Sequence, residues 1–178
     1  MNRLPNPAIS EATGKAAQLF AAIKGAIGVV PAAFATLGHN SAGALEAALT
    51  LDGAVKKGSL SAAQVEVVKL VVSQHAACDY CLGAHTMFAK RAGLGRDAIL
   101  ALRHGQPSGD AANDALATFA RAIVTGSGDL PDAALAAVKA AGISDAQLAD
   151  LAMTIASITF TNVFNRINAT VLDFPAAD

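Results

Sequence analysis

Aromatic residues and cysteines are scarce in this sequence, and runs of β-branched residues are few. Seven phenylalanines, one tyrosine and no tryptophan occur among 178 residues, although 53% of the chain is hydrophobic and alanine is the commonest residue. Alanine has the highest helix propensity and lets helix axes approach closely. One core suits a chain of this length. We therefore predict an all-α fold, a single-domain helical bundle of helix hairpins over residues 1–178.

Clusters of basic residues and long apolar runs are also missing. The net charge is -1, so neither nucleic acid nor an anionic membrane is an expected partner. The two most apolar windows, 16–37 and 148–163, are interrupted by charged, polar or proline residues and indicate core helices instead of membrane spans. The first fifteen residues lack the features of a secretory signal. These absences predict a cytoplasmic protein.

Capping and helix-breaking residues divide the chain into a series of expected helices. Ser61 and Gln64 form a capping box, Pro131 suits a first helical turn, and Gly38 with Asn40 should end a short helix. The helix that begins at Asp110 should end at Gly126-Ser127-Gly128. The expected spans are about 10–26, 31–40, 41–55, 61–74, 78–91, 95–103, 110–125, 131–140, and 144 through 163.

The two cysteines, Cys78 and Cys81, form a C-x-x-C pair. If two cysteines were placed at random, only about one pair in ninety would have this spacing. In a reducing compartment such a pair is more often a working dithiol or a pair of metal ligands than a structural disulfide. We interpret it as a redox site at the start of a helix, where the helix dipole lowers the pKa of a thiol. Asp79 opposes that effect, because a nearby carboxylate disfavours a second negative charge.

His85 and Glu66 can reach this pair. On a helix, Cys78, Cys81 and His85 fall within an arc of about 60°. A turn at 75–77 would fold the helix that carries Glu66 back along the next one, which places Glu66 and His85 within one helical turn of each other. A carboxylate on one imidazole nitrogen fixes the tautomer and makes the other nitrogen a better base toward Cys81.

Each of these residues also has a structural interpretation. Glu66 could pair with Lys69 on a solvated stripe of its helix. Zinc could be held by two cysteines and two histidines, but ligands on one helical face can hardly surround a metal tetrahedrally. The other polar residues considered are assigned ordinary roles: His39, His75 and His104 as surface or capping residues, and Asn162, Asn165 and Asn168 as partners of neighbouring backbone or another subunit.

The spacing of Glu66, Cys78, Cys81 and His85 resembles the signature of the alkylhydroperoxidase D (AhpD) core, within the carboxymuconolactone decarboxylase-like superfamily. The resemblance extends over LSAAQVEVVKLVVSQHAACDYCLGAHT, in the core motif region 60–93, and over FNRINATVLDFP at 164–175. It implies an AhpD-like helical domain that forms homo-oligomers, commonly trimers or hexamers. The decarboxylase branch is less similar, since its members characteristically lack the C-x-x-C.

The resemblance also implies an activity and the role of each residue. It implies a cysteine peroxidase or disulfide reductase that needs no cofactor. Cys81 would attack a small or organic hydroperoxide, Cys78 would resolve the sulfenic acid, and His85 with Glu66 would relay protons. The best-studied members have a histidine where this chain has Tyr80, which argues against high peroxidase efficiency but leaves dithiol chemistry intact.

An external dithiol, for which lipoyl-bearing proteins are the family expectation, would restore the reduced pair. The alternatives are a thiol–disulfide reductase, or a redox-sensing helical oligomer with little peroxidase activity.

Overall fold

The computed structural model describes residues 2–126 and 130–177, and within these ranges it contains helices and no strands. The prediction of an all-α single-domain fold is confirmed. A 3₁₀ turn, Ile9–Glu11, comes first. The α-helices are α1 (Gly14–Ile27), α2 (Ala32–Asn40), α3 (Ala42–Val55), α4 (Ala62–His75), α5 (Asp79–Arg91), α6 (Arg96–His104), α7 (Ala111–Thr125), α8 (Asp132–Ala140) and α9 (Asp145–Asn168).

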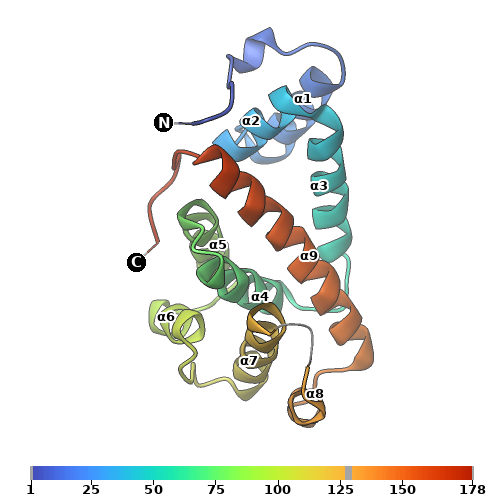
Figure 1. Ribbon diagram of the computed structural model, residues 1–178, viewed down its shortest axis with the longest axis vertical. Coiled ribbons are helices and arrows are strands. Elements are labelled where there is room, and N and C mark those ends of the chain that lie inside the picture. Colours follow the sequence, from blue (N-terminus) through green and yellow to red (C-terminus); the bar gives the residue numbers. More distant parts are fainter. Residues whose placement is uncertain (1, 127–129, 178) are drawn as a thin grey trace.

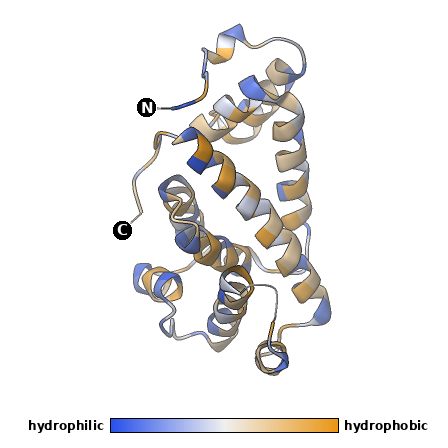
Figure 2. Cartoon of the chain, in the orientation of Figure 1, coloured by the Kyte–Doolittle hydropathy of each residue, from blue (hydrophilic) through white to orange (hydrophobic). Residues whose placement is uncertain are grey.

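Helix α4 is the centre of the bundle. It packs against α5, α6, α7 and α9, and α9 also packs along α3. Figure 1 shows α1–α3 at one end of the molecule and α6–α8 at the other, with α9 crossing between them. Helices α3 and α9 carry hydrophobic residues along most of their length (Figure 2). Helices α4 and α5 both contact α9, and most residues of α4 are buried.

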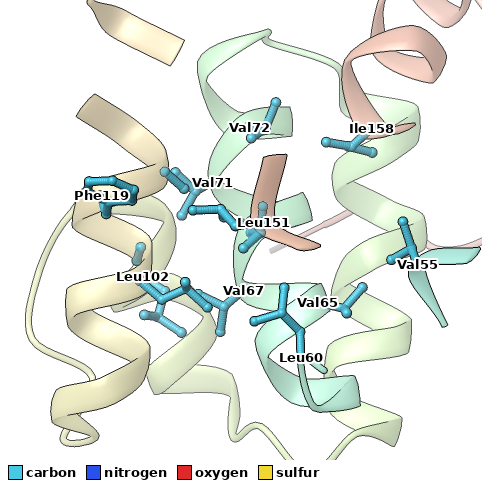
Figure 3. Close-up of a cluster of buried hydrophobic side chains, with 14 of the residues drawn as sticks. Val55, Leu60, Val65, Val67, Val71, Val72, Leu102, Phe119, Leu151 and Ile158 are labelled. Carbon is cyan, nitrogen blue, oxygen red and sulfur yellow. The ribbon is translucent and has the colours of Figure 1, made fainter. Parts of the chain in front are cut away.

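The main core surrounds α4. The side chains of Val67, Val68, Leu70 and Val71 are each 0% exposed. Figure 3 shows two of these valines in a cluster with Leu102, Phe119 and Leu151 from α6, α7 and α9. Full burial of such a side chain stabilises the fold by about 1.5–3 kcal/mol. This rigid core fixes the helix that carries Glu66 and the turn that carries the cysteines.

The helix starts follow the predicted caps. The capping box of Ser61 and Gln64 is present, and Ser144 with Gln147 forms a second one at the start of α9. Ser41 and Asp110 cap α3 and α7 through their side-chain oxygens. Pro31 and Pro131 are the residues before α2 and α8, one position earlier than a first-turn proline. The predicted stop at Gly126-Ser127-Gly128 lies mostly outside the described residues.

One expected helix boundary is wrong. The first helix does not begin at residue 10, because the Glu11 side chain accepts a hydrogen bond from the Ala8 backbone N–H (3.1 Å) and closes a separate 3₁₀ turn. Helix α2 ends at Asn40 as expected, but Gly38 lies inside it instead of at its end. A Cβ at Gly38 would be 2.5 Å from the Phe20 ring, so glycine here allows α2 to pack against α1.

Within the described residues, no helix is both long enough and apolar enough to cross a membrane.

Candidate functional site

The turn between α4 and α5 aims the cysteine pair. Ala77 adopts a left-handed conformation (φ +49°), and the Cys78 N–H donates to the Ser73 carbonyl across it (3.1 Å). This is a Schellman-type helix end, with alanine at the position that usually holds glycine. The left-handed conformation costs an alanine roughly 1–2 kcal/mol. The surrounding packing offsets this strain and makes Cys78 the capping residue of α5.

The two sulfurs are neighbours in a buried site. The Sγ atoms of Cys78 and Cys81 lie 2.6 Å apart, and both residues are free cysteines. The Cys81 backbone N–H donates to the Cys78 Sγ (3.4 Å). Cys78 is 2% exposed and Cys81 is 3% exposed. The helical spacing that the sequence indicated therefore does bring the sulfurs together.

Glu66 and His85 meet across α4 and α5. The Glu66 Oε2 lies 2.7 Å from the His85 Nδ1, and each side chain is 12% exposed. The fold-back inferred from the turn at 75–77 is thus correct. Among the described residues no hydrogen bond joins His85 to either sulfur, but on a helix the Cβ atoms of Cys81 and His85 are only ~6 Å apart. The Glu66 carboxylate thus engages Nδ1 of the imidazole and leaves Nε2 outside this pair.

The interpretation of Glu66 as a partner of Lys69 is wrong. Lys69 is 5% exposed and donates to Asp52 of α3 at 2.7 Å. The stripe of α4 that carries both residues is therefore buried instead of solvated, and each charge on it has its own partner.

The electrostatics of the pair distinguish the two thiols. The pKa of Cys78 is lowered, mainly by a hydrogen bond from the Cys81 thiol. The Cys81 N–H and the positive charge of Arg166 also lower this pKa, whereas burial and the Asp79 carboxylate raise it. The pKa of Cys81 is raised, first by its hydrogen bond with Cys78 and then by burial. In the reduced pair the first negative charge is therefore favoured on Cys78. This agrees with the helix dipole and opposes Cys81 as the first thiolate.

Sequence reasoning missed a residue of this site. The Nδ2 of Asn165 in α9 donates to the Cys81 Sγ (3.4 Å), whereas the sequence suggested a backbone or intersubunit role. Asn168 does accept from the Leu4 backbone N–H (3.0 Å). Asn162 accepts from the Ser73 hydroxyl (3.2 Å). Asn165 lies 84 positions after Cys81, so no local spacing could reveal the contact. The only available signal was the family-like ending at 164–175.

Tyr80 contacts α2 and the C-terminal segment of the chain. Its hydroxyl donates to Asp173 Oδ1 (2.9 Å) and accepts from the Ala33 N–H (3.3 Å), and its ring packs edge-on against Phe174. Burial is the main cause of a strongly raised pKa of the Tyr80 phenol. The phenol therefore stays protonated near neutral pH, and its hydrogen bonds tie α5 to α2 and to the C-terminal segment.

The remaining histidines have different surroundings. His75 and His104 are exposed residues at the ends of α4 and α6, in line with an ordinary surface role. His39 contradicts that expectation, because its ring packs edge-on against Phe20 at 5.0 Å and its Nε2 is buried without a hydrogen-bond partner. In residues 2–126 and 130–177, no three His, Cys, Asp or Glu side chains are grouped so as to hold a metal ion.

An open cavity of about 340 Å³ lies beside the turn that carries Cys78. Its lining comes from the end of α4, from Val124 of α7 and from α9, which contributes Arg166. Arg166 also donates to the Ala76 carbonyl (2.8 Å). None of the lining residues is acidic. The cavity thus combines an apolar wall with a positive charge close to the dithiol.

Known proteins share this fold and part of this sequence. Residues 42–117, which include both cysteines, match the model of the carboxymuconolactone decarboxylase family. An AhpD-core peroxidase-related protein from Ralstonia eutropha JMP134 superposes with a TM-score of 0.86 at 20% identity, over 97% of this chain and 92% of that chain. A peroxidase-related protein from Silicibacter sp. TM1040 gives a TM-score of 0.76 at 20% identity, over 95% and 89%.

A third solved structure is that of a debrominase. The debrominase Bmp8, in complex with 2,3,4-tribromopyrrole, gives a TM-score of 0.71 at 18% identity, over 88% of this chain and 84% of that chain. A search of curated proteins gave no match. The chain thus resembles the carboxymuconolactone decarboxylase family over residues 42–117 and shares its overall fold with these solved structures.

Proposed function

We propose that this protein is a dithiol peroxidase and disulfide oxidoreductase that reduces small or organic hydroperoxides. The observation that supports this most directly is the adjacent Cys78 and Cys81 sulfurs at the start of α5, the helix that also carries His85, together with the contact of His85 with Glu66 of α4. A thiolate needs a group that accepts its proton and a leaving oxygen needs a group that supplies one, and a histidine oriented by a carboxylate can do both.

The proposed reaction has three steps. The Cys81 thiolate attacks the distal oxygen of the hydroperoxide, the O–O bond breaks, and the alkoxide takes a proton from the His85–Glu66 relay to leave as an alcohol. The Cys78 thiolate then attacks the resulting sulfenic sulfur; an S–S bond forms and hydroxide leaves, which is protonated to water. An external dithiol, such as a lipoyl-bearing protein, exchanges with the disulfide and returns both thiols.

The choice of Cys81 as the attacking sulfur needs explanation, because the negative charge of the resting pair is favoured on Cys78. The two thiols share a proton, so a charge on one sulfur passes to the other by movement of that proton alone. A thiolate with a higher pKa is also the stronger nucleophile. Cys81 lies one helical turn before His85, which favours proton transfer at that sulfur.

The cavity beside the turn suits the organic part of such a substrate. Its wall includes the apolar side chains of Val72, Val124 and Val163, and Arg166 supplies a positive charge for a polar or anionic group. Its volume of about 340 Å³ lies within the range of small-molecule sites. We therefore expect an organic hydroperoxide such as cumene hydroperoxide to be reduced faster than hydrogen peroxide.

Peroxide consumption by the reduced protein tests the proposal. Wild type should consume one equivalent and form one intramolecular disulfide, and Cys81→Ser should lose this reaction. Cys78→Ser should still react once and stop at a sulfenic acid, which a sulfenic-acid trapping reagent such as dimedone detects. His104→Ala, at the exposed end of α6, is the matched control and should behave as wild type. A reduced wild type that forms no disulfide with either peroxide would exclude the peroxidase.

The second candidate is a thiol–disulfide reductase with little peroxidase activity. It is favoured by Tyr80, whose hydroxyl is held by Asp173 instead of joining the proton relay. This candidate predicts rapid reduction of oxidised lipoamide and slow reduction of both peroxides. Because the fold is similar to that of a debrominase, 2,3,4-tribromopyrrole belongs in the same substrate panel.

A further inference from the structure

A chain of hydrogen bonds runs from the N-terminal segment to the Cys81 sulfur. The Leu4 backbone N–H donates to Asn168 Oδ1 (3.0 Å), and Asn168 Nδ2 donates to Thr170 Oγ1 (2.9 Å). The Thr170 hydroxyl donates to Asn165 Oδ1 (2.8 Å), and Asn165 Nδ2 donates to Cys81 Sγ (3.4 Å). Asn165 is 5% exposed and Asn168 is 0% exposed. The chain is therefore shielded from water at both asparagines.

The donor and acceptor roles along this series of hydrogen bonds follow from the first bond. A backbone N–H can only donate, so Asn168 must turn its oxygen toward Leu4 and its amide nitrogen toward Thr170. Thr170 accepts that bond, which leaves its hydroxyl proton for the Asn165 oxygen. The Asn165 amide nitrogen then faces the sulfur. The orientation of the Asn165 amide is thus fixed by its neighbours, and it presents a donor to Cys81.

We propose that Asn165 is a further catalytic residue, whose amide N–H stabilises negative charge on the Cys81 sulfur and so directs the nucleophilic role to Cys81. The inference rests on the proposed dithiol function. Thr170 and Asn168 act as positioning residues, because they hold the amide without contact to the sulfur. A donor that is already oriented costs no rearrangement when the charge develops.

The donor matters because the two sulfurs compete for one negative charge. Cys78 receives the Cys81 N–H and lies in the field of Arg166, with Asp79 opposing. Asn165 is the matching donor on the Cys81 side. Its hydrogen bond and one from the nearby Thr161 hydroxyl both act to lower the pKa of Cys81. Glu66 and His85 contribute the remaining titratable pair, and the Tyr80 phenol is neutral. Loss of one hydrogen bond to a charged sulfur should change the partition between the two thiolates by about tenfold.

Competitive alkylation measures this partition without any peroxide. The reduced protein is treated with a limiting amount of iodoacetamide, and mass spectrometry of the peptides gives the ratio of Cys81 to Cys78 labelling. Asn165→Leu, which is similar in shape, should lower that ratio about tenfold. Thr170→Val leaves Asn165 in place but frees its amide, and should lower the ratio in the same direction by a smaller factor.

Thr154→Val is the matched control. It removes a buried hydroxyl on α9 that donates to the Asp150 carbonyl (2.7 Å) and not to a cysteine. Its labelling ratio should equal that of wild type. An unchanged ratio in folded Asn165→Leu, or an equal change in Thr154→Val, would overturn the proposal. If circular dichroism shows that Asn165→Leu does not fold, Thr170→Val decides. A protein that fails to consume peroxide can still give the predicted ratios, so the two proposals fail separately.

Discussion

Two residues on the same buried stripe of α4 each form a charged pair with a residue of another helix, and the two pairs serve different purposes. Glu66 reaches His85 on α5, and Lys69, three residues later, reaches Asp52 on α3; both contacts are 2.7 Å long. The side chains are 12% exposed in the first pair, and 7% and 29% exposed in the second. Similar length and burial therefore do not distinguish a functional pair from a structural one.

The difference lies in the partner and its position. A histidine can gain or lose its proton near neutral pH, whereas a paired lysine and aspartate keep their charges over the whole physiological range. His85 also lies on α5, which begins with Cys78 as its N-cap and Cys81 in its first turn, whereas Asp52 lies on α3. The first pair is thus suited to proton transfer, and the second to holding α3 against α4.

Of the changes that test this difference between the two pairs, Glu66→Gln should have the largest effect. Glutamine can keep a hydrogen bond to His85 but removes the negative charge against which an imidazolium forms during proton transfer. We expect peroxide reduction to slow by about a hundredfold, with little change in stability, because general acid–base groups contribute roughly 10²–10⁴-fold. Stopped-flow measurement of peroxide consumption against pH would detect it.

The control for that change is Glu46→Gln. Glu46 is also a glutamate with a cationic partner, Lys15, but its side chain is 50% exposed on α3. Its rate should equal that of wild type. If Glu66→Gln retained the full rate and the same pH profile, the pair would be structural like its neighbour on α4.

The second effect concerns stability. Asp52→Asn leaves the buried Lys69 ammonium without a counter-charge, which should lower the free energy of unfolding by about 2 kcal/mol at neutral pH. Although burial raises it, the pKa of Asp52 is held below 3.8, mainly by Lys69 and also by Lys56. The ion-pair contribution is therefore complete above the usual carboxyl pKa and is lost as the pH falls through the folded value.

Urea unfolding at neutral and acidic pH would measure both parts of this prediction. The difference between wild type and Asp52→Asn should shrink as the pH falls below about 4, and peroxide reduction should be unaffected at neutral pH. Asp145→Asn is the control, since Asp145 pairs with Lys139 at 82% side-chain exposure and should change stability by less than about 0.5 kcal/mol. A large loss of activity in Asp52→Asn would mean that the two pairs are not independent.

Local sequence pattern predicted what lies within one or two helices. The capping box at Ser61, the turn at 75–77 and the face shared by Cys78 and Cys81 depend on neighbours along the chain, and the structure contains all of them. The contact of Glu66 with His85 was also accessible, because a single turn joins their helices and fixes how they fold back.

Contacts between distant segments were not accessible in this way. Asn165 reaches Cys81 across 84 positions, and Asp52 reaches Lys69 around the bend between α3 and α4. Gly38 shows the same limit, because glycine is typical of a helix end but here it makes room for the Phe20 ring. Which residue meets which across helices depends on how the bundle packs, and periodicity along one helix carries no information about it.

The smallest effect is expected at Asp52, where two lysines that differ in solvent exposure contact the same carboxylate. Lys56 and Lys69 both contact the Asp52 carboxylate at 2.7 Å, but their side chains are 72% and 7% exposed. Water and salt screen the Lys56 contact, so Lys56→Gln should cost about 0.3 kcal/mol, in the range of exposed pairs four residues apart on a helix. Lys69→Gln should cost several times more, because it buries the Asp52 charge beside a neutral group. Urea unfolding of both variants in low and high salt tests this; equal costs would mean that the carboxylate does not distinguish its buried partner from its exposed one.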